Sequence, residues 1–171
     1  MDEVIIVDKN DTQMGTMEKM EAHQKGVLHR AISVFLFNDK QELLLQKRAS
    51  GKYHSANLWT NTCCSHPKPD EEASDAATRR LKEEMGIETP LTWCFKFHYE
   101  TKLENELTEN ELDHVFVGHY NAQVQPNPDE VSDYRYVGTK ELKSDIEAHP
   151  EAYTFWFKLI VDRVLDSYSR Y

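Results

Sequence analysis

The chain has 171 residues, of which 39% are hydrophobic, and this is enough to form one continuous core. Thirty acidic residues against 20 basic ones give a net charge of −10, which repels nucleic acid and anionic membranes. We therefore expect neither of these as a partner. Three cysteines cannot all pair internally, and Cys63 and Cys64 are adjacent, so we expect a reduced, intracellular protein.

The hydrophobic runs are too short to cross a membrane or to form a signal peptide. The longest, Val4–Val7 and Val34–Phe37, have the length of strands, and residues 1–10 contain no basic n-region. We expect one cytoplasmic domain spanning residues 1–171, present as a monomer or a weak homodimer.

Turn and capping residues divide the chain into strands and helices. Near the amino terminus, Thr16 is expected to cap a short helix that extends through Lys25 and ends at Gly26. We expect strands at Val4–Val7, Arg30–Phe37, Glu42–Lys47, Phe95–Thr101 and Leu112–Tyr120. The second and third of these strands are joined by turn residues 38–40 and predict a hairpin.

Two longer helices follow. Asp70 fits the N-cap of a helix over Glu71–Met85, in which alanines and Leu81 recur at helical spacing before Gly86 stops it. Pro150 opens a final helix that extends nearly to the end of the chain. Strands interspersed with helices predict an α/β or α+β sandwich, a mixed sheet packed between helices with a C-terminal helix.

The first of these longer helices carries an ordered pattern of charges. From Ser65 to Ile87 the chain resembles the Nudix box, whose helix holds carboxylates on one face to bind Mg²⁺ that bridges a diphosphate. The matching positions are Glu71, Arg79, Leu81, Glu83, Glu84, Gly86 and Ile87. The resemblance implies a Nudix-type sandwich. Without it, the same residues would be interpreted as a solvated charged helix.

Two positions depart from the Nudix pattern. Ser65 stands where the motif opens with Gly, and Arg80 stands where it has a Glu. Because Arg80 lies four residues before Glu84, the two share a helix face, and a cation replaces one of the ligands that gather the hydrolytic metals. The motif therefore predicts a Nudix scaffold with an altered hydrolytic metal site.

The loop ahead of this helix carries a second motif. Residues 58–67 read Leu-Trp-Thr-Asn-Thr-Cys-Cys-Ser-His-Pro and resemble the signature of type I isopentenyl diphosphate isomerases. The resemblance implies that Cys64 is the catalytic cysteine and that His66 is a metal ligand. A cysteine can act as an acid or base because its pKa, about 8.5 when unperturbed, is readily shifted by nearby charge. Cys63 alternates with Cys64 and is expected to pack inward.

The same resemblance implies a metal site built from distant parts of the chain. Its ligands would be His23, His29, His66, Glu109 and Glu111. Glu109 and Glu111 are two apart on an expected strand, so their side chains share a face with Cα atoms about 6–7 Å apart. Three imidazoles and two carboxylates suit an octahedral site with one open position for Mn²⁺, Mg²⁺, Fe²⁺ or Zn²⁺. Taken singly, each histidine is more often a surface or core residue. The histidines that match no ligand position are left as structural: His98, His114 and His119.

The family resemblance implies an allylic shift in which a proton is added to the C3–C4 double bond and another is removed from C2. Two acid/base groups must face each other across a shielded slot with electron-rich walls. Cys64 and Glu111 match the family's pair, and Tyr99 matches the tyrosine that assists proton delivery. Trp156 matches the tryptophan that lies against the cation. On sequence alone, both aromatics are more often core residues.

The substrate's diphosphate requires cations, and residues 47–82 contain seven basic side chains against four acidic ones. Lys19, Arg48 and Lys52 match the family's diphosphate contacts, with Ser65 close by. Arg79 is a further candidate. A second Mg²⁺, held by Glu84, would share the diphosphate charge.

Two rival interpretations remain open. A Nudix pyrophosphohydrolase acting on a nucleoside diphosphate derivative would keep the Glu that Arg80 replaces, and it gives no role to His23, His29 and Cys64. A catalytically silent binding module would fit the loss of that Glu but leaves Cys64 and Glu111 without a purpose.

Overall fold

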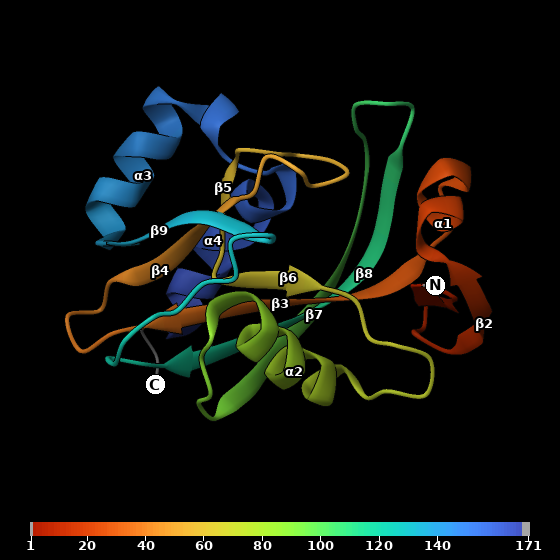
Figure 1. The fold of residues 1–171 in the computed structure, drawn as a ribbon, viewed down its shortest axis with the longest axis horizontal. Helices are drawn as coiled ribbons and strands as arrows, with labels where there is room; N and C mark the ends of the chain where they lie inside the picture. The colour runs from red at the N-terminus through yellow and green to blue at the C-terminus, as the bar shows by residue number, and fades with distance from the viewer. Residues whose placement is uncertain (1, 169–171) are drawn as a thin grey trace.

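The fold is organised around β3 (His29–Phe37), a nine-residue strand that is buried at every position except Arg30. In this computed structural model, which describes residues 2–168, β8 (Thr108–His119) pairs in parallel with the whole length of β3, from Glu111 to its end. The short strand β6 (Cys63–Ser65) pairs with β3 in the antiparallel sense. A mixed nine-stranded sheet extends from this centre (Figure 1). Segments that are far apart in the sequence therefore meet on β3.

The remaining elements follow in chain order. The other strands are β1 (Glu3–Val7), β2 (Gln13–Glu18), β4 (Leu43–Arg48), β5 (Trp59–Thr60), β7 (Leu91–Lys102) and β9 (Val131–Val137). The helices are α1 (Lys19–Lys25), α2 (Ala73–Met85), α3 (Thr139–Ala148), the 3₁₀ turn η1 (Pro150–Ala152) and α4 (Phe155–Tyr168). Among the helices of residues 2–168, none is both long and apolar enough to cross a membrane.

Helices cover both faces of the sheet, because side chains on β3 alternate between two apolar clusters. Val34 and its neighbours two residues away pack with Leu81 and Met85 of α2 on one face. Phe35 and Phe37 pack with Phe157 of α4 on the other. Figure 1 shows α2 in front of the sheet and α4 behind it. The predicted sandwich of helices around a mixed sheet, with a C-terminal helix, is confirmed.

The register of β3 with its neighbours brings the candidate site together. His29 lies opposite Glu111 of β8, and Ser33 lies opposite Cys64 of β6. Because side chains alternate along a strand, a slip of one residue would turn Glu111 to the other face. The apolar faces of β3 that fix this register therefore also fix the position of Glu111 beside His29.

Both predicted helix starts near the site are wrong. Thr16 lies in β2, which pairs with β1, so α1 begins at Lys19 and is capped by the carboxylate of Glu18. Asp70 adopts φ 64° in a turn, and α2 begins at Ala73 rather than at the predicted position two residues earlier. Both helices begin later in the chain than predicted, because the residues predicted as caps belong to a strand in one case and to a turn in the other.

The predicted helix ends are confirmed. Gly26 and Gly86 both adopt the left-handed conformation, with φ 65° and φ 66°, and close α1 and α2. A Cβ atom at Gly86 would also lie 2.6 Å from the carbonyl oxygen of Gln125, so both backbone conformation and space require glycine there.

The carboxyl-terminal region is more divided than predicted. Pro150 opens a 3₁₀ turn, and α4 begins only at Phe155, after Tyr153 and Thr154 bridge to β5. The strand β9 and the helix α3 were not predicted.

The predicted hairpin after β3 is present only at its turn, where Phe37 pairs with Leu43. Beyond the turn, β4 pairs with β5 and β9 instead of β3.

Candidate active site

A cavity of about 550 Å³ opens where β3, β6 and β8 run side by side. Most of the residues predicted for the site line it: Lys19, Arg48, Lys52, Cys64, Ser65, His66, Arg79, Tyr99, Glu109, Glu111 and Trp156. Three predicted residues, His23, His29 and Glu84, are buried but are not part of its lining. The fold therefore gathers predicted acid/base groups, aromatic residues and cations in one place.

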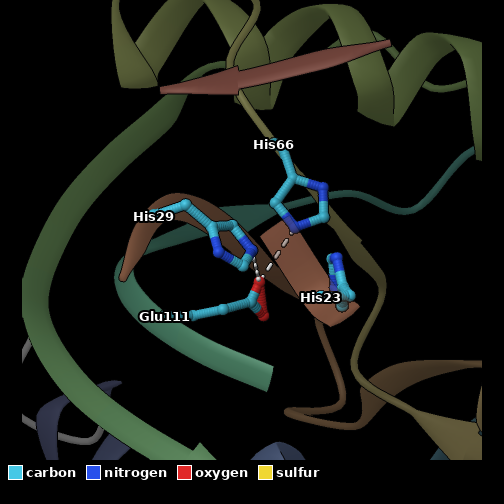
Figure 2. Close-up of side chains that lie close together, drawn as sticks. All are labelled: His23, His29, His66 and Glu111. Atoms are coloured by element: carbon cyan, nitrogen blue, oxygen red, sulfur yellow. Dashed lines mark hydrogen bonds and ion pairs between the residues drawn. The ribbon is translucent and has the colours of Figure 1, made fainter. Parts of the chain in front are cut away.

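Four of the five predicted metal ligands form one compact group. The ligand atoms of His23, His29, His66 and Glu111 lie within 4.8 Å of one another. Figure 2 shows the three imidazoles around the Glu111 carboxylate, with dashed lines from His29 and His66. The Nε2 atoms of His66 and His29 lie 2.9 Å and 3.3 Å from Oε2 of Glu111.

Backbone carbonyl groups orient two of these imidazoles. His23 Nδ1 lies 2.7 Å from the Lys19 carbonyl oxygen, and His29 Nδ1 lies 2.9 Å from that of Val27. Since a carbonyl oxygen can only accept, each Nδ1 donates its hydrogen, and Nε2 is the atom left for a ligand. His23 Nε2 is buried without a hydrogen-bond partner among residues 2–168, and the buried His29 Nε2 has only its ion pair with Glu111. A divalent cation would satisfy them, so these residues fit a metal.

The protonation states of the group follow from burial and from Glu111. Burial lowers the pKa of His23 and of His66 to about 4, so both are neutral imidazoles, the form that binds metal. Burial opposes charge on His29 and Glu111 as well. However, their contact raises the pKa of His29, and His66 together with His29 holds the pKa of Glu111 well below its usual range.

The fifth predicted ligand, Glu109, lies in a second group. Its Oε1 is 3.0 Å from Nε2 of His54, and the ligand atoms of Glu109, His54 and His23 lie within 4.8 Å of one another. The Tyr99 hydroxyl links the two groups, at 3.0 Å from Glu109 Oε2 and 2.6 Å from Glu111 Oε1. Burial and the neighbouring Glu111 charge raise the pKa of Glu109 well above its usual range.

Cys64 lies in the cavity wall between polar partners. Its Sγ donates to Oδ1 of Asn61 at 3.1 Å and accepts from Nε1 of Trp156 at 3.2 Å. Burial, reinforced by the charge of Glu84, raises the pKa of the Cys64 thiol to about 12, so the thiol keeps its proton. Cys63 points the other way, is 0% exposed and donates to Glu84 at 3.0 Å, which confirms that it packs inward.

The predicted diphosphate contacts bring three cations to the cavity. Arg48 is 5% exposed and donates to the carbonyl oxygen of His54, while its Nε atom has no hydrogen-bond partner among residues 2–168. Lys52 forms an ion pair with Glu130 at 2.5 Å. Lys19 lies within 3.5 Å of an exposed aspartate, so its amine can turn toward a ligand.

The modified helix α2 neutralises its own carboxylates. The guanidinium nitrogens of Arg80 lie 2.6 Å, 3.6 Å and 3.2 Å from carboxylate oxygens of Glu83, Glu84 and Glu130, respectively. Arg79 pairs with Glu71 at 2.8 Å, through atoms that it would otherwise offer to a phosphate. The Glu84 side chain is only 2% exposed and is separated from the cavity by these contacts.

Two buried polar residues of the cavity were not predicted. His54, 2% exposed, lies two residues after Lys52, and a histidine between two predicted site residues, Lys52 and Cys64, was its only signal. Asp113 continues the two-residue spacing of Glu109 and Glu111 along β8, and that period was its signal. Ser33 donates to Asp113 at 2.6 Å, and burial raises the pKa of Asp113 well above its usual range.

Comparison with known proteins identifies the family of the chain. The model of the NUDIX domain family matches residues 27–157. The isopentenyl-diphosphate Delta-isomerase 1 of Aromatoleum aromaticum is 54% identical over 164 residues, covering 96% of this chain and 93% of the relative. The isopentenyl-diphosphate Delta-isomerase of Pectobacterium atrosepticum is 51% identical over 169 residues, covering 99% of this chain and 94% of the relative.

Solved structures share the fold at much lower identity. DR0079 from Deinococcus radiodurans superposes with a TM-score of 0.76 at 17% identity, covering 94% of this chain and 98% of that one. The MutT protein from Methanosarcina mazei Go1 superposes with a TM-score of 0.67 at 21% identity, covering 84% and 96%. The fold is thus that of the Nudix proteins, and from the matches above the chain belongs to the Nudix family and, within it, to the isopentenyl-diphosphate Delta-isomerases.

Proposed function

We propose that this protein interconverts isopentenyl diphosphate and dimethylallyl diphosphate in isoprenoid biosynthesis. In the forward direction C4 gains a proton, positive charge develops at C3, and C2 loses a proton, so the double bond moves without net change in composition. The observation that carries the proposal is that Cys64 and Glu111, two groups able to exchange protons, line one cavity with the cations Lys19, Arg48 and Lys52. The relatives named above carry the same activity in their names.

Cys64 and Glu111 are the proposed acid/base pair. With a pKa of about 12, the Cys64 thiol holds a proton, whereas the lowered pKa of Glu111 leaves a carboxylate able to accept one. In the reverse direction the roles exchange. Tyr99 lies within hydrogen-bonding distance of Glu111 and can pass a proton between that carboxylate and the substrate.

Aromatic side chains supply the wall against which positive charge would develop. Trp156 is 3% exposed, lines the cavity and is held by Cys64 and Asn61 through its indole N–H. Its ring face can stabilise a cation by about 2 kcal/mol or more in a desolvated site. Tyr99, at 6% exposure, closes another part of the same cavity.

Basic side chains would hold the diphosphate. Arg48 is already buried in the cavity, so its binding to phosphate costs little further desolvation. Lys19, Lys52 and the Ser65 hydroxyl complete the proposed contacts. Arg79 would first have to leave Glu71, and we therefore place it last among them.

The proposed cofactors are one divalent metal, Mn²⁺, Mg²⁺ or Zn²⁺, and a second Mg²⁺. The first would be held by His23, His29, His66, Glu109 and Glu111, where its positive charge keeps the carboxylates ionised and fixed in place. The second would accompany the diphosphate, and Glu84, the residue predicted to hold it, would first have to leave its ion pair with Arg80. The buried Nε2 atoms of His23 and His29 support the first of these sites.

We further propose a cytoplasmic enzyme with one domain over residues 1–171, acting as a monomer or weak homodimer on a small diphosphate. Three free thiols support a reducing compartment: Cys63, Cys64 and Cys94.

The direct test is to incubate the purified protein with isopentenyl diphosphate, Mg²⁺ and Mn²⁺ and to follow the substrate by ¹H NMR. We expect dimethylallyl diphosphate to accumulate to an equilibrium that is also reached from the product side. In ²H₂O, deuterium should enter the methyl carbon derived from C4. If no product forms with Mg²⁺ alone, with Mg²⁺ and Mn²⁺, or with Mg²⁺ and Zn²⁺, the proposed function is wrong.

A further inference from the structure

His54 is a fourth histidine at the centre, and it is buried. It lies in the loop between β4 and β5, is 2% exposed, and faces Glu109 with Nε2 at 3.0 Å. Its ring lies edge-on to Trp156 at 5.8 Å and 5.7 Å from the His23 ring, both measured between ring centres. None of the motifs that assign the other ligands reaches this residue.

The two groups of ligand atoms cannot be two separate metal sites. Both contain His23, and its Nδ1 donates to a carbonyl oxygen, so only Nε2 can bind a cation. One nitrogen lone pair binds one ion. Two ions cannot both bind His23 Nε2, so we treat the two groups as the surroundings of one ion, in which His54 stands beside Glu109.

The geometry of His54 matches that of the predicted ligands. Its Nδ1 lies 3.0 Å from the Ser55 hydroxyl, which leaves Nε2 toward the centre, as in His23 and His29. Neighbouring ligands at right angles around an ion, each bound at about 2.1 Å, lie about 3.0 Å apart. The Nε2–Oε1 separation of 3.0 Å for His54 and Glu109 has this value, as does the 2.9 Å separation for His66 and Glu111.

We propose that His54 is the sixth ligand of the metal centre and fills the position that three histidines and two glutamates leave open. The complete set is His23, His29, His54, His66, Glu109 and Glu111. Four imidazoles and two carboxylates form an octahedral site that favours Co²⁺, Fe²⁺ or Zn²⁺ over Mg²⁺, since imidazole binds Mg²⁺ poorly. With no open position, this ion does not bind the substrate directly. The inference rests on the metal centre of the proposed function but not on its reaction.

The test measures the metal rather than the reaction. The full chain is stripped with a chelator and titrated with Co²⁺, following heat and the visible absorption of the bound ion. We expect His54→Ala to weaken Co²⁺ binding at least about 100-fold, beyond the usual range for residues that only orient a ligand. The cobalt absorption should also become more intense as coordination falls below six. His54→Gln should behave like His54→Ala, because an amide can hydrogen-bond Glu109 but is a poor replacement for an imidazole ligand.

His98→Ala is the matched control, since His98 is exposed on β7 and bonds Asn110 rather than the centre. It should leave affinity and spectrum unchanged. If His54→Gln keeps the wild-type affinity and spectrum, His54 only orients Glu109 and the proposal is wrong.

A second measurement needs no variant. Pulsed electron paramagnetic resonance of the Mn²⁺-loaded wild-type protein counts coordinated imidazole nitrogens, and four are expected. Three would overturn the inference while leaving the proposed isomerase intact, because isomerisation is measured separately through its product.

Discussion

Two regions of this protein, the metal centre and helix α2, contain many ionisable groups. Their charged and polar side chains find partners in opposite ways. At the metal centre, the buried Nε2 of His23 has no hydrogen-bond partner among residues 2–168, and that of His29 has only the carboxylate of Glu111. On α2, Glu83 and Glu84 are paired with Arg80, a cation that belongs to the chain itself. One region is thus able to take a cation from outside, whereas the other supplies its own.

The difference indicates how a Nudix scaffold can lose hydrolysis and keep its fold. Arg80 occupies the position from which a carboxylate would help to gather metal, and its guanidinium instead neutralises the acidic side chains that remain. The residues proposed to bind metal come instead from α1, β3, β8 and the loop after β6. The predictions below test whether the chemistry belongs to that second region and whether α2 is only structural.

The largest effect is expected at Cys64. Cys64→Ala should lower kcat for isomerisation by at least about 100-fold with little change in KM, since it removes a group used only in the chemical step. Cys94→Ala, a partly buried thiol on β7 outside the cavity, is the control and should remain near wild type. A Cys64→Ala enzyme with the wild-type rate would mean that Cys64 is only a packed thiol.

Removal of the cation on α2 should cost stability rather than chemistry. Arg80→Met leaves the buried Glu84 without its ion pair, and we expect a loss of roughly 2–3 kcal/mol in the free energy of unfolding, measured in urea. Arg79→Met, whose partners are more exposed, should lose about 1 kcal/mol or less.

The loss in Arg80→Met should also depend on pH. Burial already raises the pKa of Glu84 and Arg80 opposes that rise, so the variant's Glu84 pKa is higher still. A raised pKa in the folded state favours folding at low pH, so the destabilisation should shrink on acidification toward pH 5. A loss that is the same at pH 5 and pH 8 would contradict this account of Glu84.

Arg48 should affect substrate binding. Arg48→Ala should raise KM for isopentenyl diphosphate at least about tenfold, because it removes a charge that stabilises ground state and transition state alike. Lys47→Ala removes the preceding cation, which does not line the cavity, and should leave KM unchanged. An Arg48→Ala enzyme with a lower kcat and an unchanged KM would instead place Arg48 in the chemical step.

Metal binding should release protons. His29 and Glu109 have raised pKa values in the metal-free protein, whereas His23 and His66 have values of about 4. At pH 6, His29 is therefore protonated and must lose that proton to bind, while His23 and His66 have none to lose. Calorimetric titration in buffers of different ionisation heats should reveal about one proton or more released per metal. Buffer-independent heats would show that the centre is fully deprotonated beforehand.

No hydrolysis is expected from α2. With nucleoside diphosphate substrates and Mg²⁺, release of phosphate or nucleoside monophosphate should stay at background, because Arg80 replaces a metal-gathering carboxylate. Turnover on the order of 1 s⁻¹, ordinary for an enzyme, would favour the rival interpretation as a Nudix pyrophosphohydrolase. It would also mean that α2 takes part in the chemistry, as the metal centre is proposed to do.

The sequence predicted most of the fold that depends on local signals. Gly26 and Gly86 were identified as helix ends because their left-handed backbone is a local requirement. The helix starts at Thr16 and Asp70 were wrong because pairing of β2 with β1 and a turn at Asp70 decide them, and neither is visible in the local sequence. The strand β9 depends on pairing with β4, which is likewise a non-local contact.

The same division holds for the candidate site. His66, beside Cys64 in a ten-residue motif, could be assigned from spacing and resemblance. His54 could not, because its place beside Glu109 depends on how the loop after β4 folds across the sheet. The withdrawal of Glu84 from the cavity was also beyond sequence, since it results from the positions of Cys63 and Arg80.

The contact between Trp156 and Cys64 spans 92 residues of sequence, and this has a consequence for the newly made chain. The strands that bear Cys64 and Glu111 leave the ribosome well before α4 does. Until α4 docks, the thiol lacks the indole N–H that holds it, and water can reach the slot in which a carbocation would have to survive. The strands of the sheet are therefore made before α4, the helix that closes the cavity around the proposed intermediate. We expect a chain arrested before α4 to be partly folded but inactive.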